Sequence, residues 1–308
     1  MARIRTAAVL AVVGLATPAL GNGPTPDPRD DVRALYDAAI AAPDDPTRRA
    51  ALEARLPWVD ALQVYVLEGD LLISRAALRD YLKRRHEERM RLAMAKGQAP
   101  GATPNPFAIG ELLSPELKVN YVLGRPDLWR RELRGKLTYA VDRASFGGDN
   151  SQYQAVVRNL ARAAEEWEQL CPACGIDFNH VAAADAVPSF DQALIIVRAQ
   201  DVGGEFIAAA PFPSTPVDQR YLYVDPSYFT TNYDRVGVFR HELGHALGYR
   251  HEQLDALSGC YHLENDEWKA LSDYDSDSVM HYFCNGRGSL ALEFSCTDRV
   301  SHAKAYEP

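Results

Sequence analysis

Three histidines and a glutamate between residues 241 and 251 have the types and spacing of a hydrolytic metal site. His241 and His245 are four residues apart, so a helix would project both imidazoles from one face. With His251 as the third ligand, three neutral imidazoles would hold one zinc ion and leave a coordination position open for water. Zinc lowers the pKa of such a water, and Glu242 can accept the proton as a general base. These residues predict hydrolysis with Zn²⁺ as the cofactor.

The elements around this stretch must bring His251 back to the other two ligands. Apolar residues at helical spacing predict a helix through residues 236–247. In a continuous helix His251 would lie about 15 Å from His241, which is too far for one tetrahedral ion. The helix must therefore stop, and we expect this active-site helix to end at Gly248, because glycine readily takes the left-handed conformation that ends helices.

A second motif lies in YDSDSVMHY, residues 274–282. Met280 follows a short polar run there, as in the methionine turn that underlies the zinc site of metzincins. Taken together, HELGHALGYRHE, with Glu252 directly after the third histidine, and SVMHY, with Tyr282, resemble the astacin family of metzincins, in a bacterial branch. The resemblance covers about Leu123 to Pro308 and thins outside the motifs.

The resemblance implies an α+β metzincin catalytic domain, with a twisted and mostly parallel sheet, long helices and the methionine turn below the zinc. It implies a zinc endopeptidase that acts on protein or peptide substrates. Tyr282 would be an additional zinc ligand that swings away to stabilise the oxyanion, or else only a packed aromatic. Glu252 would receive the amino terminus freed by processing, or would be an ordinary polar partner. After HEQ the chain has LDALSGC, which departs from the family's pattern.

The amino terminus predicts export. Arg3 and Arg5 precede an apolar run and then small residues, which is typical of a signal peptide, here residues 1–21. The mature protein is expected to be secreted or periplasmic. No later stretch approaches the roughly 20 apolar residues of a membrane-spanning helix, so no stable membrane insertion is expected. The formal net charge of −9 argues against nucleic-acid partners.

All five cysteines lie in the second half of the chain, and an exported protein would normally oxidise them. A bridge between Cys260 and Cys284 would brace the methionine turn. The family resemblance implies a second bridge, from Cys171 or Cys174 to Cys296. The CPAC stretch is also compatible with a redox pair or half a zinc knuckle, but no second CxxC is present to complete a zinc knuckle.

The chain is expected to divide into a propeptide-like, mainly helical region with a linker, residues 22–118, and a catalytic domain, residues 119–308. Helical spacing marks residues 31–42, and a second helix should run from after Ser74 to Gly97. The following QAPGATPNP is typical of a linker. Beyond it, a helical stripe up to Trp167 alternates with strand candidates at residues 137–142, 175–178, 193–197, 205–209 and 221–224.

Asp70 is the candidate for a zymogen switch. Astacin zymogens resemble one another in an FxGD stretch whose aspartate occupies the zinc, and residues 67–70 are LEGD. The resemblance thus implies intramolecular inhibition by Asp70, because a carboxylate is a zinc ligand that displaces the water. The alternative is that Gly-Asp is ordinary turn chemistry.

Two other classes of function were compatible with the motif. One is an exported, inactive metzincin-scaffold protein for binding or adhesion, and the other is a zinc-stabilised structural protein. A pseudoenzyme would be expected to have lost Glu242 or a histidine, and a structural site would supply a fourth protein ligand to close the open position. Because Glu242 and the histidines are all present, the sequence favours an active endopeptidase.

Overall fold

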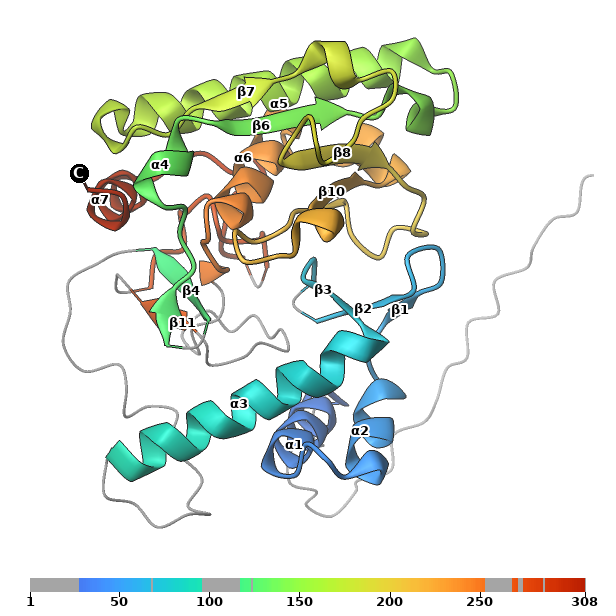
Figure 1. Ribbon diagram of the computed structural model, residues 1–308, viewed down its shortest axis with the longest axis vertical. Coiled ribbons are helices and arrows are strands. Elements are labelled where there is room, and N and C mark those ends of the chain that lie inside the picture. The colour runs from blue at the N-terminus through green and yellow to red at the C-terminus, as the bar shows by residue number, and fades with distance from the viewer. Residues whose placement is uncertain are drawn as a thin grey trace, which may run out of the picture.

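A five-stranded sheet forms the centre of the larger unit of the computed structural model (Figure 1). Its order is β7-β6-β8-β10-β9. The β7–β6, β6–β8 and β8–β10 pairs are parallel, whereas the edge strand β9 runs antiparallel to β10. The expected mixture of helices and strands is confirmed, with the strands at β6 (Leu137–Val141), β7 (Phe178–His180), β8 (Ile195–Ala199), β9 (Ala208–Ala209) and β10 (Tyr221–Val224).

The structure describes residues 28–67, 69–95, 117–122, 124–252, 268–270, 274–284 and 286–307. The expected signal peptide lies outside these ranges, as does most of the linker. Among the helices that are described, none combines the length and the apolar character needed to cross a membrane.

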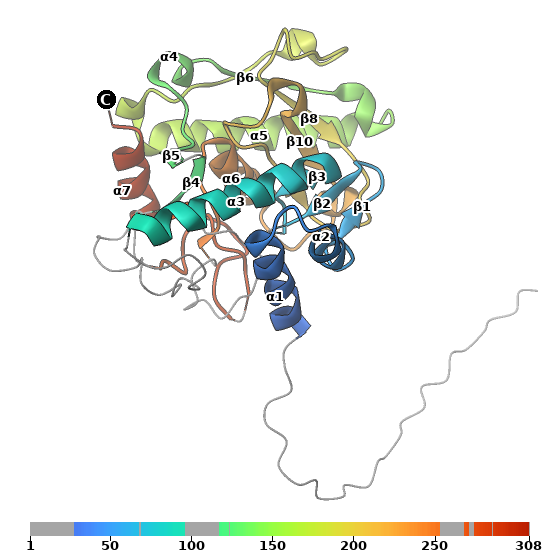
Figure 2. The same ribbon diagram turned by 60° about the horizontal axis from the view of Figure 1, so that its bottom comes forward.

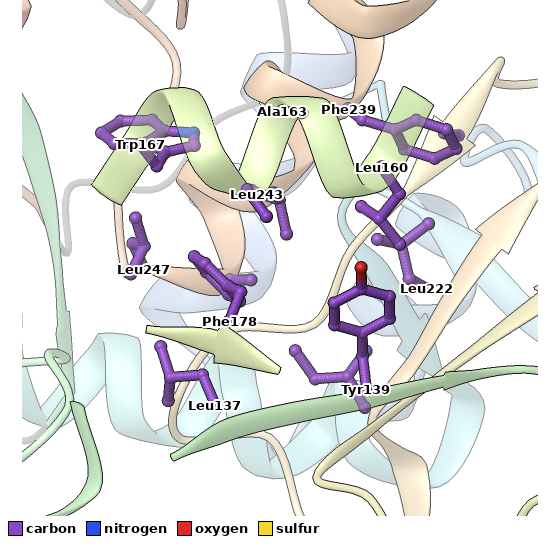
Figure 3. Packing of buried hydrophobic residues seen from close by; sticks show 14 of the residues in the cluster. Leu137, Tyr139, Leu160, Ala163, Trp167, Phe178, Leu222, Phe239, Leu243 and Leu247 are labelled. Carbon is purple, nitrogen blue, oxygen red and sulfur yellow. The ribbon is translucent and has the colours of Figure 1, made fainter. Parts of the chain in front are cut away.

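Helices α5 (Asn150–Leu170) and α6 (Arg235–Ala246) pack on each other and on the sheet. Figure 3 shows side chains of α5, among them Leu160 and Trp167, packed with Leu243 of α6 and with residues of β6 and β7. Each buried side chain of this size contributes about 1.5–3 kcal/mol. Of the stripe expected for α5, five residues are buried and Val157 is half-buried; the buried residues are Tyr153, Val156, Leu160, Ala164 and Trp167.

Shorter elements connect these layers. Helix α7 (Cys296–Ala305) begins with a capping box between Ser295 and Asp298. The remaining helix of the larger unit is α4 (Arg131–Arg134). Single 3-10 turns lie at η2 (Arg143–Phe146), η3 (Pro172–Cys174), η4 (Ala182–Ala184), η5 (Val217–Gln219) and η6 (Pro226–Phe229).

A three-stranded sheet, in the order β11-β4-β5, lies next to the segment that follows α6. Its strands are β4 (Lys118–Val122), β5 (Arg125–Pro126) and β11 (Trp268–Ala270). The Arg250 amide donates to Lys118 O at 2.7 Å, and the Asn120 amide donates to Gly248 O at 2.8 Å. Lys118, which the sequence assigned to the end of the linker, is therefore part of the larger unit.

The amino-terminal unit has a core of its own. Helices α1 (Pro28–Ala41), α2 (Pro46–Glu53) and α3 (Arg75–Ala95) enclose it, as Figures 1 and 2 show. An antiparallel sheet, β1 (Trp58–Val59), β2 (Val64–Val66) and β3 (Leu72–Ser74), adds to these helices. The sequence did not predict this sheet, because strands of two or three residues are too short for an alternating pattern to be recognised.

The two units meet in a small apolar cluster. Val59 and Val66 of the first unit pack with Val202, Phe206 and Ala209 of the second. This contact joins the β1–β3 sheet to the region of edge strand β9. It places Asp70, which lies between β2 and β3, beside His241 and His245 of helix α6.

Candidate metal centre

Helix α6 supplies two of the three predicted histidine ligands. It begins after Asp234, whose carboxylate accepts a hydrogen bond from the Gly237 amide at 2.6 Å. It ends at Ala246, and Gly248 follows with φ of +97°. A Cβ atom on Gly248 would lie 2.0 Å from Asp127 O, so both conformation and space require glycine here. The chain turns at this glycine, as the spacing of the histidines required.

The three imidazoles converge on one point. His245 Nε2 lies 3.2 Å from His241 Nε2 and 3.1 Å from His251 Nε2, and the remaining pair is 3.2 Å apart. A tetrahedral zinc ion with Zn–N bonds of about 2.0–2.1 Å holds its ligand atoms ~3.3 Å apart. The separations of the three nitrogens therefore suit such an ion.

Hydrogen bonds at the Nδ1 atoms of these rings determine which nitrogen carries the proton of the neutral imidazole. His241 Nδ1 donates to Val279 O and His245 Nδ1 donates to Tyr249 O, each at 2.8 Å, since a carbonyl can only accept. Burial lowers the pKa of His241 to about 4, so its ring is neutral at pH 7. Its Nε2 thus presents a lone pair. Together with the Nε2 atoms of His245 and His251 and a carboxylate oxygen of Asp70, it forms a cluster that fits a metal site.

Asp70 lies at the fourth position around the same point. Its Oδ2 atom is 3.6, 3.3 and 3.2 Å from the Nε2 atoms of His241, His245 and His251 respectively. The side chain is 3% exposed. Gly69 before it has φ of +89°, which marks a tight turn. The sequence allowed Gly69-Asp70 to be either an ordinary turn or a segment that places a carboxylate at the metal. In the structure the two residues form a turn, and that turn places Asp70 beside the three histidines.

Glu242 lies beside the four-residue cluster. Its Oε2 atom is buried and has no hydrogen-bond partner among the described residues. Burial and the negative charge of Asp70 raise the pKa of this carboxyl well above its ordinary value. A hydrogen bond from the Ala210 amide lowers the pKa and only partly offsets this increase. A buried carboxyl with a raised pKa and an unused acceptor atom is suited to proton transfer.

Tyr282 lies on the other side of the same point. Its ring centroid is 4.7 Å from those of both His241 and His251. Its hydroxyl donates a hydrogen bond to Asp70 Oδ2. Burial and the negative charges of Asp70 and Glu242 raise the pKa of Tyr282 well above its ordinary value, so the hydroxyl keeps its proton. Tyr282 is thus both a packed aromatic and a hydrogen-bond donor at the centre.

Met280 packs directly against α6. A Cβ atom on Gly244 would lie 2.3 Å from Met280 Sδ, so the helix needs glycine for this approach. Asp298 of α7 holds the turn, because its carboxylate accepts hydrogen bonds from Ser278 Oγ at 2.6 Å and from the Val279 amide at 2.8 Å. Sequence reasoning did not single out Asp298, which is distant from the motif along the chain.

A pocket of about 230 Å³ lies beside Glu242 and Tyr282. One of its walls is Leu292, which has φ of +46°, a conformation that is strained for leucine. The Leu292 carbonyl accepts a hydrogen bond from Arg240 of α6, and this contact holds the strained turn against the helix. The pocket is mainly apolar, with Phe206, Ile207, Ala208, Tyr233, Val238 and Leu292 in its lining.

Glu252 is paired with Lys118. Their charged groups are 2.8 Å apart, and both side chains are 1% exposed. Glu252 therefore has a buried cationic partner within the chain. The sequence did not single out Lys118, since no local pattern connects residues 134 positions apart.

The disulfides differ from the expectation. Cys171 and Cys174 are bonded to each other, and Cys296 is a free, exposed thiol. The pairing of Cys171 or Cys174 with Cys296 that the family resemblance implied is therefore wrong, because a turn of η3 brings the first two cysteines together locally. Cys284 is disulfide-bonded, but Cys260 lies outside the described residues, so the Cys260–Cys284 pair stays a prediction.

Comparisons with known proteins show a distant structural likeness. No family model matches the chain, and no curated protein sequence matches it. A solved structure of myroilysin is similar to 62% of this chain and to 98% of its own chain, at 19% sequence identity and a TM-score of 0.41. A likeness at this level carries no functional argument, so the function must be argued from the site itself.

Proposed function

We propose that this chain is a secreted or periplasmic zinc endopeptidase of the astacin-like metzincin type, made as a latent zymogen. One observation carries the proposal. The Nε2 atoms of His241, His245 and His251 lie within 3.2 Å of one another, beside a buried Glu242 oxygen that has no hydrogen-bond partner in the described residues. When bound there, zinc supplies a Lewis acid that polarises a carbonyl and makes water nucleophilic at neutral pH.

The side chains around this point have separate tasks. Glu242 accepts a proton from the attacking water and passes it to the leaving amine. The Tyr282 hydroxyl, which keeps its proton, donates a hydrogen bond to the oxyanion once Asp70 has left. Edge strand β9 offers backbone groups to an extended peptide, and the adjacent apolar pocket takes a side chain next to the scissile bond.

Asp70 is proposed to keep the precursor inactive. Its carboxylate has distances to the three imidazoles that suit a fourth ligand, and it accepts the Tyr282 hydrogen bond that catalysis would use. The amino-terminal unit holds Asp70 there through the apolar contact of Val59 and Val66 with the larger unit. Processing between the two units would release it.

The test is hydrolysis of a quenched-peptide library by the purified chain, intact and cleaved in the linker. Cleavage should leave Leu117 and Lys118 in place, because β4 starts at Lys118 and bonds to the segment after α6. Activity confined to the cleaved form, and abolished by Glu242→Ala or by chelation, would support a latent zinc peptidase. Amino-terminal sequencing of the exported protein would test the signal peptide.

The competing proposal is an exported, inactive binding or adhesion protein on the same scaffold. Folded, zinc-loaded protein that cleaves no peptide in either form would favour it. The structure offers no argument for it, because the residues needed for hydrolysis lie together and the pocket beside them is open to a ligand. A zinc-stabilised structural protein would keep Asp70 as a permanent fourth ligand, so zinc-loaded chain cleaved in the linker would stay inactive.

A further inference from the structure

The buried pair of Lys118 and Glu252 joins three segments of the metal centre. Lys118 Nζ donates to Glu252 Oε2 at 2.8 Å and also to Glu252 O at 2.9 Å. Glu252 directly follows His251, and its amide donates to Met280 O at 2.9 Å. The Asp275 amide adds a contact of 3.3 Å to Glu252 Oε2. Strand β4, the His251 segment and the methionine turn are thus connected through one carboxylate.

Backbone contacts hold the Lys118 segment against the segment before His251. Lys118 opens β4, where its carbonyl accepts from the Arg250 amide at 2.7 Å and Val119 forms a bridge with Tyr249. A carboxylate as deeply buried as that of Glu252 requires a compensating charge, because an isolated buried ion is strongly destabilising. Lys118 provides this charge from within the chain.

Resting on the proposed function, we propose that Lys118 is a positioning residue that keeps the metal centre assembled in the unprocessed chain. Maturation then needs only the departure of Asp70, and no particular new amino terminus. The rival possibility is that a freed terminus must reach Glu252, whose Oε1 atom is buried without a hydrogen-bond partner in the part of the chain that is described. The two possibilities make different predictions for the effect of replacing Lys118 on zinc retention. They also differ in whether activity depends on the position of cleavage.

The first experiment measures metal retention in the full-length chain. Zinc-loaded Lys118→Met is dialysed against a chelator beside wild type and Lys136→Met, which changes an exposed lysine. Loss of a contact that orients a metal ligand costs about 10–100-fold in metal affinity. We expect a loss in this range for Lys118→Met and none for Lys136→Met. Equal retention by the two variants would overturn the proposal.

A second variant separates positioning from folding. In Lys118→Met/Glu252→Gln no buried charge is left unpaired, so the melting temperature should recover relative to Lys118→Met alone. Zinc retention should stay low, because β4 is still not linked to the His251 segment. If the double variant retains zinc as wild type does, or if Lys118→Met lowers only the melting temperature, Lys118 is merely structural and the proposal fails.

The last experiment tests the amino terminus. A specific protease site is placed at either of two positions between residues 98 and 114 of the full chain, which is folded first and cleaved afterwards. The two products should have kcat/KM values within about twofold of each other, a difference below ~0.5 kcal/mol. Activity at one cleavage position alone would overturn the proposal. Absence of Glu242-dependent hydrolysis in every form would refute the peptidase, while the zinc-retention results would still report on Lys118.

Discussion

Asp70 Oδ2 and His251 Nε2 lie 3.2 Å apart although 181 residues separate them along the chain. Two separately cored units must therefore dock correctly for this contact to form. The contact connects the proposed latency of the uncleaved chain to the residues that would bind the metal.

Replacement of Asp70 should activate the uncleaved chain. Asp70→Ala removes the carboxylate from the fourth position and with it the hydrogen bond that the Tyr282 hydroxyl donates. Hydrolysis of a short peptide should therefore rise by about tenfold or more, the effect of one contact worth ~1.4 kcal/mol. The substrate must be short because the amino-terminal unit stays docked. Asp80→Ala, at an exposed aspartate of α3, is the matched control. An uncleaved Asp70→Ala chain that is as inactive as Asp80→Ala would contradict the switch.

The methionine turn should depend on Asp298. Asp298→Asn puts an amide where three donors, Ser278 Oγ and the Val279 and Ser295 amides, now meet a carboxylate. Leaving a buried donor without its acceptor costs about 1–3 kcal/mol. We expect a lower melting temperature and weaker zinc retention, because Val279 O accepts the hydrogen bond of His241. Asp277→Asn, at an exposed neighbouring position, should change neither, and equal behaviour of the two variants would speak against this role.

Acid stability should depend on His302. Burial, and then the charge of Arg134, lower the pKa of His302 to about 3 in the folded state, whereas an unfolded histidine titrates near ~6.5. As pH falls through this window the unfolded chain takes up a proton that the folded chain does not, so stability decreases. In His302→Gln this part of the decrease should be absent.

The measurement for His302 is urea unfolding of wild type and His302→Gln, with matched metal content, from pH 7.5 to pH 5. The difference in free energy of unfolding between the two should be constant above about pH 7 and should shift in favour of the variant below it, by up to ~1.4 kcal/mol per pH unit. Parallel curves over the whole range would show that His302 does not titrate as argued.

The pocket beside Glu242 should select apolar side chains next to the scissile bond. Each additional buried CH₂ group is worth about 0.8 kcal/mol, or roughly fourfold in kcat/KM. A substrate series with Gly, Ala, Val, Leu and Asp at the flanking positions, cleaved by the processed enzyme, should rank Leu highest and Asp lowest. The carboxylates of Glu205 and Glu242 at the pocket add to the rejection of Asp.

A variant at Leu292 tests which wall gives this selectivity. Leu292→Gly accepts the φ of +46° without strain and removes the side chain from the pocket. We expect the ratio of kcat/KM for Leu over Gly substrates to fall, while Glu242-dependent hydrolysis of the Gly substrate continues. An unchanged ratio would assign the selectivity to another surface.

The local part of the centre was predictable from residue spacing. A helix separates residues four apart by one turn, so His241 and His245 had to share a face, and His251 could join them only after a break at Gly248. The stripe of α5 and most strand candidates were likewise visible in the periodicity of apolar residues, although the candidate at residues 175–178 overlaps β7 only at Phe178 and the candidate at residues 205–209 overlaps β9 only at Ala208 and Ala209. These features depend on neighbours within a few residues, which a sequence displays directly.

Packing between distant segments decided the rest. The pairing of Lys118 with Glu252, the support of the methionine turn by Asp298 and the strained Leu292 at the pocket wall all join residues far apart in the chain. The bond between Cys171 and Cys174, by contrast, is local, and it replaced the longer bridge that a family resemblance implied. The sequence by itself determined which side chains could bind a metal, because helix geometry sets their spacing. Only the tertiary structure decided which partners brace them, because docking of separate elements depends on side-chain packing that no local pattern records.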